Sequence, residues 1–280
     1  MVEPAPEWRV KYDGPCARCG TLLHQGTIAV WDRRSRSMHC VECPPDARSD
    51  PPPAPLETGI AGASAKREHD RRMARREAAA TARWGERFGA YVARFGDPPP
   101  STRAWAIGAR GEEKLAAELS KVEGLYVLND RKVPRTRGNI DHIVISQAGV
   151  FVVDAKNIRG RIYVRNRGWP WKPDYRLYVG GRDRSELAAN LDWQVDAVGS
   201  ALILAGIDPM PTITPVLCFI DGDWPFIDRP DEFDGVRIES ERSIGRLVTR
   251  KAELDASRIE EIARTIAGAL PPKVASSDRS

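Results

Sequence analysis

Apolar residues recur with two different periods along this chain, and the change of period outlines its main fold. Leu115, Leu119 and Val122 follow a helical spacing and predict a helix over residues 111–122. The same period predicts helices over residues 186–204 and 255–270. Short β-branched or apolar runs bounded by turn residues predict strands at residues 125–128, 140–145, 150–155, 162–164 and 213–220. This alternation of helices and strands predicts an α/β fold.

Composition divides the chain into five predicted parts. Six prolines in residues 44–63 disfavour helix and sheet, and the Lys/Arg/Ala-rich stretch after them predicts a helix that ends before Gly96. The predicted parts are a cysteine-bearing segment at 1–43, a Pro-rich linker at 44–63, a basic helical connector at 64–100, a main domain at 101–270 and a disordered tail at 271–280.

Charge and hydropathy exclude few classes of function. The chain has 43 Lys and Arg residues against 39 Asp and Glu residues, and a net charge of +4 is too small to indicate a polyanionic partner by itself. No apolar run approaches the roughly 18 residues of a membrane helix, and residues 1–10 lack the apolar stretch of a secretory signal. We therefore expect a cytoplasmic protein without a membrane partner, and the sequence leaves its oligomeric state open.

Four of the five cysteines form two Cys-x-x-Cys pairs, which is a metal-site spacing. Four thiolates suit tetrahedral zinc, and the residues between the pairs are enough for a β-hairpin that brings the pairs together. Because four thiolates leave no open coordination position, we expect a structural zinc ribbon. Two unliganded dithiols are the alternative, and His24 or His39 are alternative ligands. The predicted zinc ligands are Cys16, Cys19, Cys40 and Cys43.

Asp141, Asp154 and Lys156 are the strongest candidates for chemistry in the main domain. They fall on two predicted strands joined by a tight turn around residues 146–149, so an even-length loop places all three on one face of the sheet. One register sets Asp141 opposite Asp154, and the other sets it opposite Lys156. Two carboxylates so close together repel unless a cation or a proton lies between them. The alternative is a structural salt bridge to Lys156.

Two polar residues interrupt the apolar stripes of predicted helices. Glu112 lies on the stripe of Leu115 and Leu119, where a carboxylate is destabilising unless it is paired or binds a metal. Gln194 lies among the apolar residues of the helix over 186–204, and a partly exposed polar residue is the alternative explanation there.

The segments GARGEEKLAAEL, NIDHIVISQAGVFVVDAKNIRGRI and NLDWQVDAV resemble the nuclease-related domain (NERD) family over roughly residues 105–220. That family is placed in the PD-(D/E)XK endonuclease-like superfamily. The resemblance implies a restriction-endonuclease-like α-β-β-β-α-β core with a Mg²⁺-type site. It also implies that Glu112, Asp141 and Asp154 bind Mg²⁺ or Mn²⁺, with Lys156 and Gln194 as further catalytic residues. Asp154 stands where many relatives of the superfamily have Glu.

Cations on both sides of the acidic motif favour a nucleic-acid partner, and ordinary solvated loop charge is the alternative explanation for them. The predicted phosphate contacts are Arg131, Lys132, Arg135, Arg137, Arg159, Arg161, Arg165 and Arg167. Trp169, Trp171 and Tyr175 follow them, and we expect them to pack beneath their loop rather than to stack on bases. The sequence as a whole predicts a metal-dependent nuclease acting on DNA, with RNA as an alternative substrate. A non-catalytic module that binds nucleic acid or protein on the same fold is the alternative function.

Overall fold

The computed structural model describes residues 7–32, 37–42, 55–86, 97, 99–136, 138–250 and 252–273. The chain divides into two compact units, Met1–Pro55 and Leu56–Ser280. Residues 56–63, within the range of the predicted linker, therefore belong to the second unit. In the described part of the chain, no helix combines the length and the apolar character that crossing a membrane requires.

The first unit is a small β structure with very little core. Its strands are β1 (Glu7–Arg9), β2 (Gly14–Pro15), β3 (Leu22–Leu23), β4 (Ile28–Asp32) and β5 (Ser37–Cys40). β1, β4 and β5 form one antiparallel sheet, and β2 pairs with β3. The buried apolar residues described in this unit are Val10, Cys16, Leu23 and Ala29. So small a core gives little stability on its own, so the unit needs another source of stability.

The second unit is built on a six-stranded mixed sheet in the order β13-β14-β12-β8-β7-β6. Its strands are β6 (Tyr126–Lys132), β7 (Asn139–Ser146), β8 (Gly149–Lys156), β12 (Ile213–Phe219), β13 (Glu232–Phe233) and β14 (Val236–Ser240). β6, β7 and β8 pair antiparallel, whereas β8, β12 and β14 are parallel. β8 is buried from Gly149 to Asp154, which explains why its sequence is continuously apolar rather than alternating.

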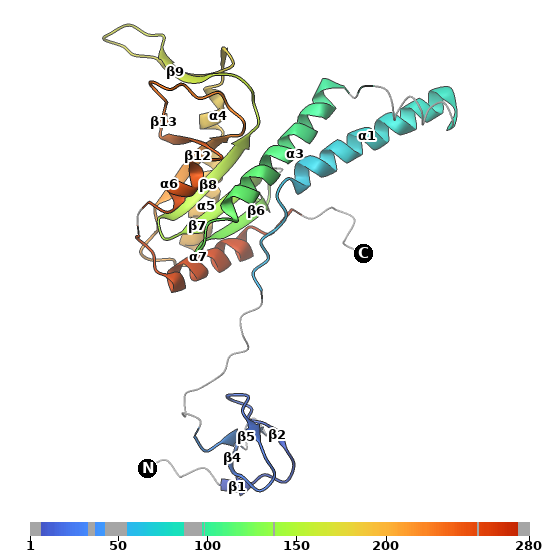
Figure 1. Cartoon of the computed structure of the whole chain (residues 1–280), viewed down its shortest axis with the longest axis vertical. Coiled ribbons are helices and arrows are strands. Elements are labelled where there is room, and N and C mark those ends of the chain that lie inside the picture. Colours follow the sequence, from blue (N-terminus) through green and yellow to red (C-terminus); the bar gives the residue numbers. More distant parts are fainter. Residues whose placement is uncertain are drawn as a thin grey trace. The chain divides into compact units, whose positions relative to one another are not determined.

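Helices cover both faces of this sheet (Figure 1). They are α1 (Ala63–Trp84), α3 (Pro100–Leu119), α4 (Glu186–Ala189), α5 (Asp192–Leu204), α6 (Ile244–Val248) and α7 (Ala256–Ala269). α5 and α7 pack on the face that presents Ile143 and Val152, while α3 packs on the face that presents Val144 and Val153. A separate three-stranded sheet of β9 (Ile162–Asn166), β10 (Tyr175–Val179) and β11 (Arg182–Asp183) lies in the chain between β8 and α4.

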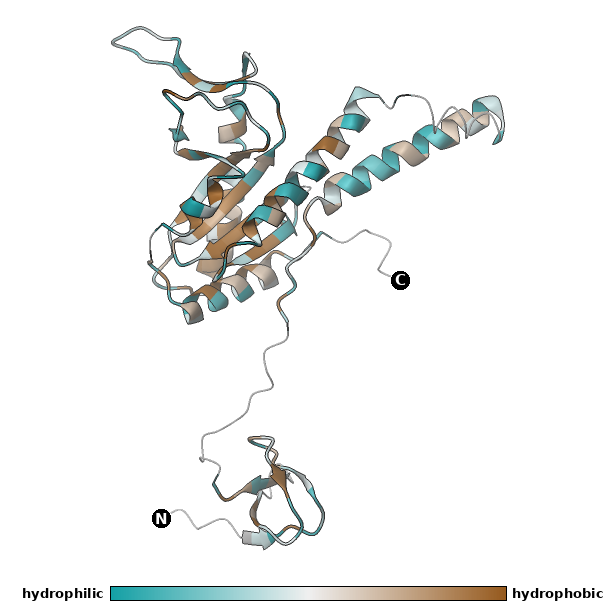
Figure 2. Cartoon of the chain, viewed as in Figure 1, coloured by the Kyte–Doolittle hydropathy of each residue, from teal (hydrophilic) through white to brown (hydrophobic). Residues whose placement is uncertain are grey.

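The helices differ from the predicted ones for local physical reasons. α3 begins at Pro100 rather than at residue 111, and proline is favoured in the first turn of a helix. α3 packs on α1, whose surface is largely hydrophilic (Figure 2). α1 ends at Trp84, where Gly85 takes a left-handed backbone conformation with φ 76°. The predicted helix over 186–204 is two helices, because tighter i→i−3 hydrogen bonds at Leu191 and Gln194 interrupt it.

Candidate functional site

Three aspartates form a row across strands β6, β7 and β8. Asn129 pairs with His142 and Arg131 pairs with Ile140, so Asp130 and Asp141 face each other between these pairs. His142 pairs with Val153, and the next position along the two strands brings Asp141 beside Asp154. The loop of this hairpin is Gln147–Ala148, so the structure has the first of the two registers considered from the sequence. The sheet thus places three carboxyl groups on adjacent strands.

Two of these carboxyl groups have cationic or hydrogen-bonding partners that balance their charge. Asp130 is buried, and it accepts hydrogen bonds from Ser64 Oγ at 2.7 Å, Arg67 Nη2 at 3.0 Å and Asn139 Nδ2 at 3.0 Å. Asp154 is also buried, and it accepts a hydrogen bond from Lys156 Nζ at 2.5 Å.

Asp141 is the member of the row whose charge is least compensated. Burial raises the pKa of Asp141 well above its ordinary range, and repulsion from Asp154 and Glu112 adds to the rise. A hydrogen bond between the carboxyl groups of Asp141 and Asp154 contributes in the same direction. Burial opposes the charge on Lys156, but Asp154 and Asp141 outweigh it and raise the pKa of that amine. The arrangement favours a proton or a cation between the two carboxyl groups.

Glu112 joins this group from α3. Its carboxylate is buried, and its Oε2 accepts a hydrogen bond from the backbone N–H of Gly62 at 3.1 Å. Burial raises the pKa of Glu112 to about 7; the Gly62 N–H opposes the rise, and repulsion from Asp130 and Asp154 adds to it. Glu112 thus lies within electrostatic range of Asp130 and Asp154. It also fixes the start of α1, which the sequence did not indicate.

A cavity of 1020 Å³ opens onto these side chains. Glu112, Asp141 and Lys156 line it, and α1 and the first half of α3 contribute other parts of its wall. The cations that line it are Arg67, Arg71, Lys132, Lys156 and Lys273. The cavity is therefore a place where a phosphate group can reach acidic and basic side chains together.

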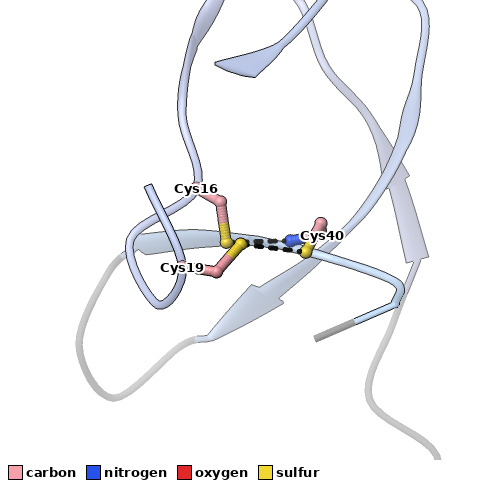
Figure 3. A group of neighbouring side chains, drawn as sticks. All are labelled: Cys16, Cys19 and Cys40. Atoms are coloured by element: carbon pink, nitrogen blue, oxygen red, sulfur yellow. Dashed lines mark hydrogen bonds between the residues drawn. The ribbon is translucent and has the colours of Figure 1, made fainter. Parts of the chain in front are cut away.

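Three thiols of the first unit form a second cluster of candidate ligands (Figure 3). The Sγ atoms of Cys16, Cys19 and Cys40 lie within 4.8 Å of one another, the only such group of three ligand atoms among the described residues. Hydrogen bonds from Thr21 and then from the other two cysteines lower the pKa of Cys19 to about 6. Burial raises the pKa of Cys16, but backbone N–H groups, including that of Cys40 at 3.2 Å, outweigh it and lower that pKa. Cys43 lies outside the described residues.

Residues 107–220 match the family described as NERD, nuclease-related domain. These residues form a nuclease-related domain. The chain is also 41% identical over 69 residues to an uncharacterized protein of Bacillus anthracis, a match that covers 23% of this chain and 32% of that protein. The chain thus spans about a third of the length of this relative. No solved structure matches the chain.

Gln194 is a predicted site residue for which the structure shows no hydrogen bond to the carboxyl groups among the described residues. It is buried near the start of α5, and its Nε2 donates to the carbonyl oxygen of Asn190 at 3.3 Å. Its Oε1 is buried without a hydrogen-bond partner among the described residues, and Gln194 does not line the cavity of the nuclease-related domain.

The predicted phosphate contacts separate into several groups. Arg131 is a correction: it is fully buried, and its guanidinium donates to the carbonyl oxygens of Glu57, Ala267 and Leu270, so it cannot meet a phosphate. Lys132 lines the cavity, and Arg137 lies outside the described residues. The remaining predicted contacts are exposed on loops or on the β9–β10 hairpin: Arg135, Arg159, Arg161, Arg165 and Arg167.

The aromatic residues after β9 are also a correction. Trp169, Trp171 and Tyr175 are 68%, 79% and 59% exposed, so they do not pack beneath their loop. The rings of Trp169 and Trp171 stack on each other with centroids 5.3 Å apart. The sequence indicated aromatic residues at this place, but only the hairpin geometry turns them toward solvent.

Sequence reasoning missed two parts of the site, Asp130 and the start of α1. The pattern Asp130-x-Lys132 was visible, but its position beside Asp141 depends on the β6–β7 register. Gly62 has φ 72°, and a Cβ there would lie 2.8 Å from the carbonyl oxygen of Ala109. A glycine in the middle of a loop-like sequence gave no sign of this close contact.

Proposed function

We propose that this protein is a metal-dependent nuclease that hydrolyses phosphodiester bonds in DNA. The observation that supports it most is the pair of acids Asp141 and Asp154, which are neighbours across β7 and β8. Asp141 and Lys156 line a cavity with a cationic wall, and Lys156 donates a hydrogen bond to Asp154. The nuclease-related domain over residues 107–220 supports the same class of function.

The donor set fits a hard divalent cation such as Mg²⁺ or Mn²⁺. Hard cations prefer carboxylate oxygens, and Mg²⁺ typically uses one or two carboxylates. Asp141 and Asp154 would hold the ion directly. Because the three acids do not bring their oxygens within 4.8 Å of one another, Glu112 would act through water. When bound, the ion would neutralise charge and polarise the phosphoryl oxygen.

The side chains of the chain itself have separable tasks in this proposal. The Lys156 ammonium stabilises the negative charge that develops on the phosphate, and its ion pair with Asp154 keeps it charged. Glu112, which the metal would keep in its charged form, would accept a hydrogen bond or a proton from a water molecule beside the ion. Gln194 positions α5 beside the sheet, and its buried Oε1 is available to a water molecule.

Cations at the cavity wall would hold the rest of the nucleic acid. Arg71 of α1 is mostly exposed at the cavity wall, and Lys132 and Lys273 approach the cavity from β6 and from the segment after α7. Arg67 is instead occupied by Asp130, so we assign it a structural task. Phosphate contacts of this kind fix the orientation of a strand without reading its sequence.

The first unit would bind structural zinc through its thiol cluster. Lowered thiol pKa values favour thiolates, which are the form that binds zinc. Cys16, Cys19 and Cys40 supply three ligands, and Cys43 would complete the tetrahedral set.

A cleavage assay with a matched pair of variants tests the proposal. The full chain is incubated with single-stranded, nicked, branched and duplex DNA, and with RNA, in Mg²⁺, in Mn²⁺ and in EDTA. We expect metal-dependent cleavage of DNA that Asp154→Asn and Glu112→Gln abolish. Glu113→Gln is the control, because Glu113 is the exposed neighbour of Glu112 on the same helix. Cleavage that persists in EDTA or in pure Asp154→Asn protein contradicts the assignment.

A non-catalytic binding module is the second candidate. The ion pair between Lys156 and Asp154 and the bond from Gly62 to Glu112 compensate two of the acids without any metal. That candidate is favoured if the protein binds nucleic acid but cleaves none of the substrates with either ion. The ribbon-like first unit would then act as a further contact for nucleic acid or for a protein.

A further inference from the structure

The β9–β10 hairpin presents an outer face in which aromatic and cationic side chains alternate. Tyr163 pairs with Tyr178, and Arg165 pairs with Arg176, so these four residues share one face of the two strands. The opposite face carries Ile162, Leu177 and Val179, which are buried, together with the half-buried Val164. One face of the hairpin is thus part of the core. The other is exposed at Arg165 and half-buried at Arg176 and at Tyr163 and Tyr178, whose rings stack on each other.

Two arginines lie directly opposite each other on this outer face. Directly opposed β-carbons in an antiparallel pair are about 5 Å apart, and like charges at that distance destabilise the pair. Arg176 has a partner, because its Nε donates to Asp174 Oδ1 at 2.8 Å. Arg165 is exposed and makes no ion pair within the described part of the chain. An anion above this face would remove the repulsion.

The end of the hairpin exposes two tryptophans in a well-defined turn. Trp169 and Lys172 exchange both backbone hydrogen bonds, at 2.9 and 3.0 Å. Asn166 Oδ1 accepts from the backbone N–H groups of Gly168 and Asp174, both at 2.9 Å. The turn projects from the second unit (Figure 1). These hydrogen bonds fix the turn that carries Trp169 and Trp171. Exposed large apolar side chains on a fixed turn indicate a contact surface, because their exposure to water is unfavourable unless a partner covers them.

We propose that this outer face, made of Tyr163, Arg165, Arg167, Arg176 and Tyr178 with the Trp169–Trp171 pair at its end, binds unpaired bases of a nucleic-acid strand. Residues 161–183 contain six cationic and two acidic side chains, so the hairpin is complementary to a polyanion. Exposed aromatic rings stack on bases, and only unpaired bases offer their faces for stacking. The inference rests on the proposed function for the choice of nucleic acid as partner, but not for hydrolysis.

The experiment measures binding without cleavage. Fluorescence anisotropy with a labelled oligothymidylate, a blunt duplex and an RNA strand is recorded for the full chain in EDTA. We expect tighter binding to the single strands than to the duplex. Each of Trp169→Ala and Trp171→Ala should weaken single-strand binding about tenfold, since one stacked base is worth about that much. A comparison of the DNA and RNA strands identifies which source of unpaired bases binds better.

Matched controls separate the hairpin from a general loss of aromatic or cationic surface. Phe226→Ala removes a fully exposed aromatic ring outside the hairpin and should leave the affinity unchanged. Arg165→Glu should weaken binding, whereas Arg182→Glu should do so much less, because Arg182 pairs with Val179 and so belongs to the other face of the same sheet. Circular dichroism checks that the variants are folded; Arg165→Lys, which keeps the charge, should bind nearly as wild type.

The outcomes distinguish this inference from the proposed function. If the tryptophan variants bind the single strand as tightly as wild type, or lose no more than Phe226→Ala does, the hairpin is not a binding surface. Failure of the wild-type chain to bind any single strand also overturns the inference. Loss of binding in the variants supports it even if the wild-type chain cleaves nothing with Mg²⁺ or Mn²⁺, and in that case only the nuclease proposal fails.

Discussion

The two candidate metal sites of this protein lie in units whose apolar cores differ greatly in size. The thiol cluster of Cys16, Cys19 and Cys40 lies in a unit whose described core has four buried apolar residues. The carboxyl cluster lies on strands β6, β7 and β8 of a six-stranded sheet with extensive apolar packing on both faces. A metal at the first site would supply stability that the small core lacks, whereas a metal at the second would relieve the repulsion between the carboxyl groups. Under our proposal, ion binding would therefore stabilise the fold of the first unit and would prepare the catalytic site of the second.

The largest expected effect is the loss of the first unit when its metal is removed. Structural zinc contributes on the order of 10 kcal/mol in small domains, far more than so small a core provides. Chelation, or Cys16→Ser, should unfold residues 10–42 and leave the second unit folded. Two-dimensional NMR of the full chain checks this, together with a zinc assay of the native protein. Cys218→Ala is the control, because Cys218 is buried in β12 and its loss should weaken only the second unit. A native protein without zinc would contradict the claim that a bound metal stabilises the first unit.

A smaller effect is expected from pH on the metal-free second unit. The pKa of Glu112 is raised from 4.5 to about 7, so the folded state holds a proton that the unfolded state releases. Its contribution to stability is complete below pH 4.5 and is lost as pH rises toward 7, by about 3 kcal/mol at most. Asp141, whose pKa is also raised, acts in the same direction. Urea unfolding in EDTA at several pH values in this range measures the slope of the free energy of unfolding against pH.

Glu112→Gln should flatten that slope, and Glu113→Gln should not. Added Mg²⁺ should restore stability at pH 7 if the carboxyl groups bind it. A free energy of unfolding that rises with pH over this range would show that the folded protein already favours the charged form of these acids.

Replacing one acid should stabilise the second unit, which is the reverse of replacing a thiol in the first. We expect Asp141→Asn to raise the free energy of unfolding at pH 8 without metal, because desolvation and the neighbouring acids Asp154 and Glu112 disfavour the charged carboxylate, whose pKa they raise. The same variant should lose metal-dependent cleavage. Denaturant unfolding and the cleavage assay give the two readouts. Destabilisation by Asp141→Asn would indicate that its carboxylate has a structural partner.

The smallest effect concerns the phosphate contacts at the cavity. Lys132→Ala should weaken DNA binding a few-fold and reduce the salt dependence of the affinity by about one counterion. Lys66→Ala is the control, because Lys66 is exposed on α1 but does not line the cavity. Anisotropy titrations at several salt concentrations measure both. Equal effects of the two changes would mean that the cavity wall has no special part in binding.

Periodicity and motifs determined much of this protein before any tertiary information. The strands around residues 140–145, 150–155 and 213–220 were predicted because a strand buried in a sheet shows itself as a short apolar run, and the nuclease-related resemblance followed from the blocks around Asp141 and Asp154. Cys16, Cys19, Cys40 and Cys43 were predicted to meet because four thiolates suit zinc and the residues between the two pairs are enough for a hairpin. The structure brings the first three together.

Only the tertiary structure decided which charges meet and which are hidden. Arg131 and Lys132 are neighbours in sequence, yet one is buried among carbonyl oxygens and the other lines the cavity, because successive side chains of a strand point to opposite sides. Asp130 joins Asp141 through strand register, and Gly62 reaches Glu112 across fifty residues. Such contacts between distant segments leave no local pattern, since neither partner's sequence neighbourhood records where the other segment will pack.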